Sequence, residues 1–398
     1  MRGCATWGRS LVRNERGMAL AVAVFAMVII AALVAGTFFA AFAHVRMSRS
    51  GAYAAAAFQA ADAGLDQAIA TWDPFSVDTL TVQNSMTLAG GALATGQSYT
   101  PTVTRLSGTL FRVQSLGTKT VGGTVQSSRL LATLVRKNPA SVDVKGAITV
   151  RGSIKISGSS QINGTDLVPA NWGAVCNGAG AGVAGVRDST SHADSANQIQ
   201  TSGACSGATC ITGNPKILVD TTVSTKTFTQ FGDLSFTDLA AMADKTLPGG
   251  TYNGIGPTYN APVPPSTTQT CRRTDLSNWG APTAVSTNAC FNYFPIIYSS
   301  GDLHLTGGTG QGILLVDGDF TVDGGFEFYG PVIVKGTASS QGTGGHIYGG
   351  LLAGNADLSL TTITGNSVVD YSACALQRAV LGTSRVKPLK NHAWGQLR

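Results

Sequence analysis

The chain carries one uninterrupted apolar run, MALAVAVFAMVIIAALVAGTFFAAFA, from Met18 to Ala43. These 26 residues hold no charge, and as a helix they exceed the roughly 20 that a bilayer requires. A cleaved secretory signal is the alternative, but its apolar core would be only about 7–15 residues long. Four arginines precede the run, so the positive-inside rule places everything after His44 outside. We therefore expect a single-pass inner (cytoplasmic) membrane protein, anchored by residues 18–43, with an exported C-terminal region.

The helical pattern does not stop where the apolar run ends. Beyond it, apolar residues continue on one helical face at three- and four-residue spacing, namely Phe58, Ala61, Leu65, Ala68, Ile69 and Trp72. Asp62 and Asp66 fall on other faces, and Pro74 ends the pattern. The sequence therefore predicts one helix over residues 18–73, half of it in lipid and half outside.

The pattern changes to alternation after this helix. SYTPTVTRL, LFRVQSLG and SSRLLATLVRK alternate apolar and polar residues, with glycine-rich turns between them. Such segments are typical of antiparallel hairpins with one buried face. We expect residues 74–138 to form a small antiparallel β unit packed against the outer half of the helix.

Further along, short apolar strands are punctuated by glycine at a nearly constant period. ILLVDG at 313, VIVKG at 332 and GLLAG at 350 are 19 and 18 residues apart. This periodicity predicts a parallel β-solenoid over residues 296–376, in which Leu314, Val316, Val332, Val334 and Leu351 stack in register. GAITVRGSIKISGSSQING is of the same style, and we expect residues 139–168 to supply the first coils.

Residues 169–295 lack this periodicity and read as an irregular, cysteine-containing insertion, whereas residues 377–398 read as a C-terminal tail or cap. Six cysteines lie beyond the membrane run and Cys4 before it. An even set in an exported region favours disulfides, although six cysteines allow fifteen connectivities. Spacing suggests the near neighbours Cys205 with Cys210 and Cys271 with Cys290, leaving Cys176 with Cys374. The spacings typical of zinc sites are absent, so we expect no metal.

The N-terminal residues carry a resemblance. A basic leader ending in ERG, the long apolar helix and then AFQAADAGL (Ala57–Leu65) resemble the N-terminal region of PilX-type minor pilins. The resemblance covers about residues 14–72 and implies that a prepilin peptidase cuts the leader, residues 1–17, between Gly17 and Met18. It also implies that Phe58, Ala61, Asp62 and Leu65 belong to a filament-assembly helix and that other pilin-like subunits are partners. Two positions depart from the pilin pattern: Met18 replaces the usual Phe, and Val22 replaces a Glu.

The distribution of charge along the chain argues against nucleic-acid binding. The formal net charge is +6, but four arginines of the leader account for much of it. Without the leader the balance is 23 basic minus 20 acidic residues, or +3. We therefore expect no nucleic-acid partner.

Because β-solenoids also host polysaccharide-cleaving enzymes, catalytic residues are a possibility that the sequence must be tested for. Asp317, Asp319 and Asp323 lie in VDGDFTVDGG, and the first two share a strand face. Aspartate beside glycine is, however, the usual chemistry of turns, and His304 and His346 are isolated. No GxSxG, HExxH or Walker A spelling occurs. We expect no catalytic residue and no cofactor.

The fold class predicted is mainly β with one long N-terminal helix: a pilin-like helix and small antiparallel sheet, then a right-handed parallel β-helix with a disulfide-containing insertion. The function predicted is a minor-pilin-like structural or assembly component of a type IV pilus or related surface filament, whose surface ligand is open. Three alternatives remain: an uncleaved signal anchor, a wall or matrix scaffold, and a membrane-tethered β-solenoid that binds or cleaves polysaccharide. Aromatic residues along one solenoid face would favour the last, and Phe326, Phe328 and Tyr329 are its candidates.

Overall fold

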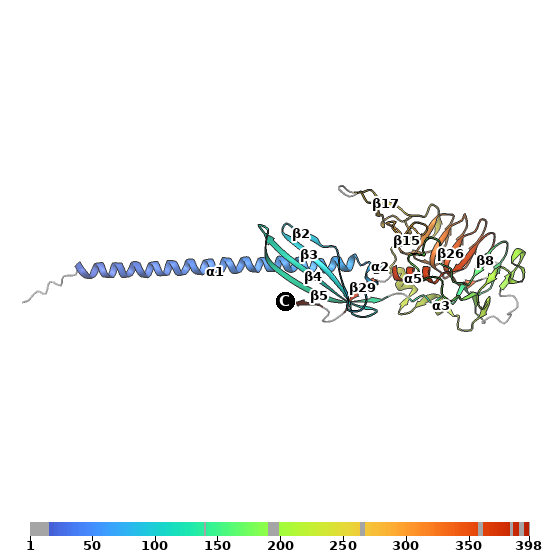
Figure 1. The fold of residues 1–398 in the computed structure, drawn as a ribbon, viewed down its shortest axis with the longest axis horizontal. Helices are drawn as coiled ribbons and strands as arrows, with labels where there is room; N and C mark the ends of the chain where they lie inside the picture. Colours follow the sequence, from blue (N-terminus) through green and yellow to red (C-terminus); the bar gives the residue numbers. More distant parts are fainter. Residues whose placement is uncertain are drawn as a thin grey trace, which may run out of the picture.

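The computed structural model describes residues 16–138, 141–189, 199–262, 267–356, 361–382, 385–389 and 394–397. Most of the predicted leader, including Cys4, lies outside these ranges. Within them the chain forms a long helix, an antiparallel sheet beside its second half, and a parallel β unit beyond the sheet (Figure 1).

Helix α1 (Arg16–Ala70) is continuous over 55 residues. At 1.5 Å per residue this is a rod of about 80 Å. It begins two residues before the predicted start and ends close to the predicted end. After it, Asp73 caps the short helix α2 (Pro74–Val77) by accepting a hydrogen bond from the Phe75 N–H at 3.1 Å.

The antiparallel sheet lies along the second half of α1. Its core is the meander of residues 97–138, in which Val103, Phe111, Val113, Leu131 and Val135 are fully buried and face the helix. In the described residues the sheet has seven strands: β1 (Ser85–Thr87), β2 (Gly91–Ala94), β3 (Gln97–Arg105), β4 (Leu110–Val121), β5 (Thr124–Asn138), β29 (Arg385–Pro388) and β30 (Trp394–Leu397).

Strands β29 and β30 correct the prediction for residues 377–398. Val386 pairs with Lys137 and Gly395 with Ala132, both antiparallel, so this segment completes the first sheet rather than forming a tail. The C-terminal strands accordingly lie beside β5, far from the outer end of the molecule (Figure 1). The parallel β unit is therefore inserted between two neighbouring strands of the antiparallel sheet.

Two parallel sheets face each other in the outer unit and enclose an apolar core that takes residues from both. In the described residues the first sheet comprises β6 (Gly146–Gly152), β8 (Gln161–Asn163), β9 (Ala184–Asp188), β11 (Ile211–Thr212), β12 (Ile217–Val219), β15 (Lys245–Leu247), β19 (Ile296–Ser299), β21 (Thr309–Gln311), β22 (Ile313–Val316), β24 (Glu327–Val334), β26 (His346–Ala356) and β28 (Val368–Tyr371). The second comprises β7 (Ile154–Ile156), β10 (Ile199–Thr201), β16 (Gly250–Tyr252), β20 (Leu303–Leu305), β23 (Phe320–Val322), β25 (Ala338–Ser340) and β27 (Thr362–Ile363).

The register of these strands is the one that the glycine periodicity predicts. Leu314 pairs with Val332, Val316 with Val334 and Val332 with Leu351, all in parallel. Both faces of the first sheet are buried around β22 and β24, because the inner face contacts the second sheet and the outer face is covered. This explains why ILLV is a continuous apolar run rather than an alternating one.

The rung order corrects two predictions. Residues 139–168 do not form the first coils: Ile148 of β6 stacks beyond the C-terminal repeat, on Leu351 of β26. Residues 169–295 are not simply an irregular insertion. Val186 and Ile217 add rungs beyond β6, whereas Lys245 adds a rung at the opposite end, on Ile297.

The outer face of the first sheet is covered by helix α5 (Ala373–Gly382) and by aromatic residues from the connecting segments. The remaining elements are η1 (Gly203–Ala208), α3 (Thr225–Thr229), β13 (Gln230–Phe231), β14 (Leu234–Ser235), α4 (Phe236–Ala241), β17 (Tyr259–Asn260), β18 (Thr270–Cys271) and α5 (Ala373–Gly382).

Candidate functional site

The two halves of α1 have different surroundings. Every residue from Leu20 to Ala52 is exposed, including large apolar side chains such as Phe25, Phe38 and Phe42. Within the described residues, α1 is the helix that is long and apolar enough to cross a bilayer. An apolar surface of this length must be covered by lipid or by other apolar surfaces.

The second half of α1 is seated on the sheet through small residues. Ala57, Ala60, Ala61 and Ala68 are almost completely buried. A Cβ added to Gly117 of β4 would lie 2.8 Å from the Ala61 Cα and would collide with the Ala57 carbonyl oxygen. The helix and the sheet therefore meet backbone to backbone. The alanine-rich sequence after the apolar run is what permits this close approach.

The predicted assembly residues lie on both the buried and the exposed face of the second half of α1. Ala61 and Leu65 are buried and Phe58 is half-buried against the same core, whereas Asp62 is exposed. Gly17 and Met18, the predicted cleavage pair, lie in the first turns of α1. Gly117 was not singled out from the sequence, although a glycine within a strand pattern is a known sign of close backbone approach.

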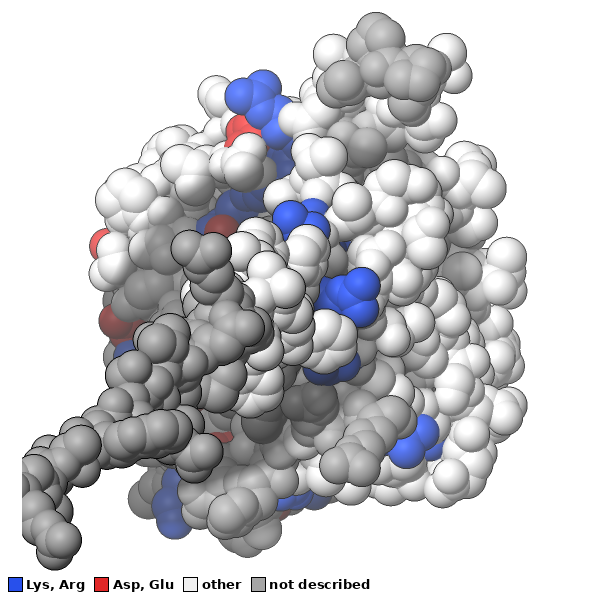
Figure 2. Space-filling view, turned by 90° about the vertical axis from the view of Figure 1, so that its left-hand side faces the viewer, with Lys and Arg blue, Asp and Glu red and all other residues white. Residues whose placement is uncertain are grey.

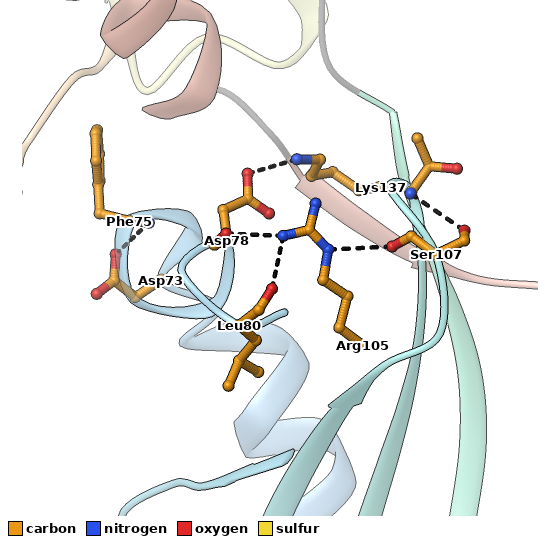
Figure 3. Close-up of polar contacts among 8 residues, drawn as sticks. Asp73, Phe75, Asp78, Leu80, Arg105, Ser107 and Lys137 are labelled. Carbon is orange, nitrogen blue, oxygen red and sulfur yellow. Dashed lines mark hydrogen bonds and ion pairs between the residues drawn. The ribbon is translucent and has the colours of Figure 1, made fainter. Parts of the chain in front are cut away.

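A polar junction fixes the chain where α2 enters the sheet (Figure 3). The Arg105 guanidinium donates through Nη1 to the carbonyl oxygens of Asp78 and Leu80, both at 2.8 Å, and through Nε to that of Ser107 at 3.2 Å. Lys137 Nζ lies 2.5 Å from Asp78 Oδ2, with both side chains largely buried. The loop after α2, strand β3 and strand β5 are thus held together at the end of the sheet that adjoins the outer unit.

The outer unit contacts this end through an aromatic cluster around Arg378 of α5. Its guanidinium carbon lies 4.7 Å from the Phe75 ring centroid and 5.2 Å from that of Phe294. Arg378 also donates to Asn292 Oδ1 at 2.6 Å. Burial lowers the pKa of Arg378 to about 10, so the group stays charged at neutral pH. An open cleft of 520 Å³ lies beside this contact, lined by residues of both units.

The candidate aspartates are each held by a partner of their own. Asp317 pairs with Lys335 at 2.5 Å and accepts from the Tyr298 hydroxyl at 3.2 Å. Asp319 accepts from the Thr337 N–H at 2.7 Å, which caps the next rung. Asp323 lies 2.9 Å from His304 Nε2. The first two carboxylates engage different groups one rung further along the stack, as turn-capping residues do.

The candidate aromatic residues lie in the core. Phe326, Phe328 and Tyr329 are buried, with relative exposures of 1, 0 and 4 %. Tyr329 stacks on Tyr348, with ring centroids 4.5 Å apart, and burial raises its pKa. His346 stacks on Tyr348 and bonds Asp370 at 2.8 Å. These three aromatic side chains therefore offer no exposed platform for a sugar ring.

A shallow groove of 540 Å³ does lie on the outward face of the second parallel sheet. Several polar groups line it: Thr251, His304 and Thr321 occupy equivalent positions on adjacent strands, and Asp302 and Asp319 also line it. Among the described residues there is no group of three or more His, Cys, Asp or Glu placed to hold a metal ion.

The six cysteines that follow the apolar run form three disulfides. Cys176 is joined to Cys374, Cys205 to Cys210 and Cys271 to Cys290. These are the pairs that the spacing suggested. The first ties the segment before β9 to the start of α5 and so links parts of the outer unit that are 198 residues apart.

Comparisons with known proteins add little to this geometry. No protein-family model and no curated protein matches the chain. A solved structure that does match is the competence-associated pilin ComZ from Thermus thermophilus. The match covers 86 % of this chain and 97 % of that one at 12 % identity, with a TM-score of 0.25. At this TM-score the likeness carries no argument.

Proposed function

We propose that the protein is an exported, minor-pilin-like component of a type IV pilus or related surface filament. The observation that carries this proposal is the division of α1. One half is an exposed apolar rod, and the other half of the same helix is seated on an antiparallel sheet through alanine and glycine. A subunit built in this way can exchange lipid for the apolar helices of neighbouring subunits without refolding its head.

The outer unit is, in this proposal, a β-solenoid displayed at the surface. Support comes from the near-constant offset between stacked residues, from Ile297 to Leu314 to Val332 to Leu351. Insertion between β5 and β29 gives the solenoid two chain connections to the sheet. A displayed unit held in this way follows the orientation of the filament subunit more closely than one on a single linker.

We further propose that the protein is non-catalytic and that its partners are the membrane, other pilin-like subunits and a prepilin peptidase. The separate engagement of Asp317 and Asp319 by Lys335 and Thr337 supports a structural role for both carboxylates. Exposure of Asp62, beside buried Ala61 and Leu65, makes it available to a neighbouring subunit.

A second candidate function, polysaccharide binding by the tethered outer unit, is favoured by one observation. The groove on the second parallel sheet presents hydroxyl and imidazole groups from successive strands, a donor and acceptor set suited to sugar hydroxyls. Binding to this groove is compatible with the filament role, whereas cleavage would contradict the non-catalytic proposal.

The experiment is to shear filaments from the surface of cells and probe them for the chain. Ala31→Asp places a charge mid-span at a cost of about 2.5–3.5 kcal/mol on insertion scales and should remove the chain from both membranes and filaments. Ala31→Leu is the matched control. Asp317→Asn combined with Asp319→Asn should leave surface assembly unchanged. Cleavage of a polysaccharide panel by the wild type, lost in this double variant, would instead establish an enzyme.

A further inference from the structure

The antiparallel sheet has a one-sided charge. Residues 79–138 contain six lysines and arginines and no aspartate or glutamate. The helix immediately after the membrane run is also basic, because His44, Arg46 and Arg49 precede the first acidic residue, Asp62. The face of the molecule that looks along α1 toward its N-terminus shows scattered Lys and Arg and few acidic groups (Figure 2).

The β4–β5 hairpin is the part of this sheet that reaches furthest toward the N-terminal half of α1. Contacts between helix and sheet fix the direction: Gly64 meets Ser115, and Gly117, two residues further along β4, meets Ala57 and Ala61. The strand therefore runs toward the membrane half of the helix (Figure 1).

The tip of the hairpin lies close to the expected bilayer surface. Val121 is four residues beyond Gly117, about 13 Å along a strand, which equals about nine helical residues. The tip is then level with about Ser50, roughly 10 Å above Ala43, the end of the apolar run. Headgroups extend about 5–8 Å beyond the hydrocarbon, and a typical helix tilt of about 20° closes the remaining distance on one side.

The composition of the tip suits a lipid interface. Gly122 and Gly123 adopt positive φ and make the tight turn. On either side Val121 and Val125 are 45 and 58 % exposed, and Lys119 lies two residues before Val121. Lys119 also donates to the Thr95 carbonyl at 2.9 Å and so ties the neighbouring β2–β3 loop to the hairpin.

We propose that this hairpin tip docks on an anionic lipid surface, with Val121 and Val125 at the headgroups and Lys119, Arg46 and Arg49 facing lipid phosphates. The inference rests on the membrane anchor of the proposed function. Docking fixes the orientation of the antiparallel sheet relative to the bilayer before the subunit assembles. Withdrawal of α1 from the membrane then releases the hairpin tip from the lipid. Each basic residue near an anionic surface contributes roughly fivefold to such an equilibrium.

The test uses the full chain reconstituted into vesicles of brominated phosphatidylcholine, with or without phosphatidylglycerol. Val125→Trp reports on the tip and Val219→Trp, 54 % exposed on the outer unit, is the control. Each is compared with the parent chain to subtract the native tryptophans. We expect quenching of Val125→Trp in anionic vesicles, weaker quenching in neutral vesicles or high salt, and none above background for Val219→Trp.

Charge variants sharpen the assignment. Lys119→Gln should lower the docked fraction by roughly fivefold, whereas Arg151→Gln, on the outer unit, should leave it unchanged. Quenching that is equal in neutral and anionic vesicles, or no greater at Val125→Trp than at Val219→Trp, overturns the proposal while leaving the anchor intact. A second pilin-like subunit as the true occupant would show as shielding of Val125→Trp from aqueous acrylamide without bromolipid quenching. Failure of the full chain to float with vesicles would instead overturn the anchor itself.

Discussion

The antiparallel sheet and the parallel β unit are assembled from the chain in opposite ways. Strands β1 to β5 are chain neighbours, and a helix directly before them closes their apolar face. The rungs of the parallel unit do not follow the chain: proceeding along the first parallel sheet, Lys245, Ile297, Leu314, Val332 and Leu351 precede Ile148, Val186 and Ile217.

The difference shows what holds each region. In the antiparallel unit the critical feature is a close approach of two backbones at Gly117, which depends on the absence of side chains. In the parallel unit it is a continuous apolar stack, closed at both ends by rungs from the cysteine-containing segment. We therefore expect an added side chain at the helix–sheet contact to destabilise the antiparallel unit, and a charge introduced into the apolar stack to destabilise the parallel unit.

The largest effect is expected in the middle of the stack. Val332 is fully buried and pairs with Leu314 on one side and Leu351 on the other. Val332→Asp places an unpaired charge there and should cost about 3–5 kcal/mol, enough to unfold the outer unit. Thermal unfolding of the full chain, followed by tryptophan fluorescence, measures the loss. Val219→Asp, at an exposed rung position, is the control, and equal midpoints for the two variants would show that the register is wrong.

A smaller effect is expected at the seat of α1. Gly117→Ala adds a methyl group against the backbone of Ala57 and Ala61, neither of which has a side chain that can move aside. We expect a loss of about 3 kcal/mol and faster proteolysis after α1, with the outer unit intact. Gly108→Ala makes the same substitution where no atom lies within 4 Å. Equal stability of the two variants would contradict the close packing of helix and sheet.

The polar junction at the end of the antiparallel sheet should be destabilised more by the loss of one charge than by the loss of two. Lys137→Met leaves Asp78 largely buried without its cation and should cost about 2 kcal/mol. Adding Asp78→Asn removes the stranded charge and should recover part of this loss. Lys226→Met, at an exposed site, serves as the control. Additive losses in the double variant would mean that the two side chains do not interact.

The smallest effect concerns an end rung of the stack at low pH. Hydrogen bonds from the Thr222 hydroxyl and N–H, and then from Arg187, lower the pKa of Asp220 to about 2. Because the unfolded chain titrates near pH 4, this stabilisation is complete above about pH 4 and is lost as the pH falls toward about 2. It should amount to about 1 kcal/mol, given the partial exposure of the carboxylate. Asp220→Asn should reduce the difference between the thermal midpoints at pH 5 and pH 2. An unchanged difference would contradict this prediction.

The local features of both regions could be predicted from the sequence. Apolar length and spacing predicted α1, alternation predicted the meander β3-β4-β5, and glycine periodicity predicted the pairing of Val332 with Leu314 and Leu351. The spacing of the cysteines also suggested the pairs that the structure contains. Each of these signals lies within a short window or in a simple count.

The remaining features are pairings between distant segments, which no local pattern records. Stacking of Ile148 on Leu351, the rungs supplied by residues 169–295 and the return of β29 to β5 depend on tertiary packing alone. Arg378 is similar, because nothing in ACALQRAVL indicates that its guanidinium would meet Phe75 from the other unit. Gly117 is the exception, since a glycine inside a strand pattern could have been recognised.

The most direct test of the account is the mass of the chain recovered from cell membranes and from sheared filaments. A pilin-like subunit should lack residues 1–17 and begin at Met18, with or without an added methyl group on its amino terminus. N-terminal peptide analysis of the same material would locate the cut. A chain that retains Met1 in both fractions would contradict the filament role and identify α1 as an uncleaved anchor.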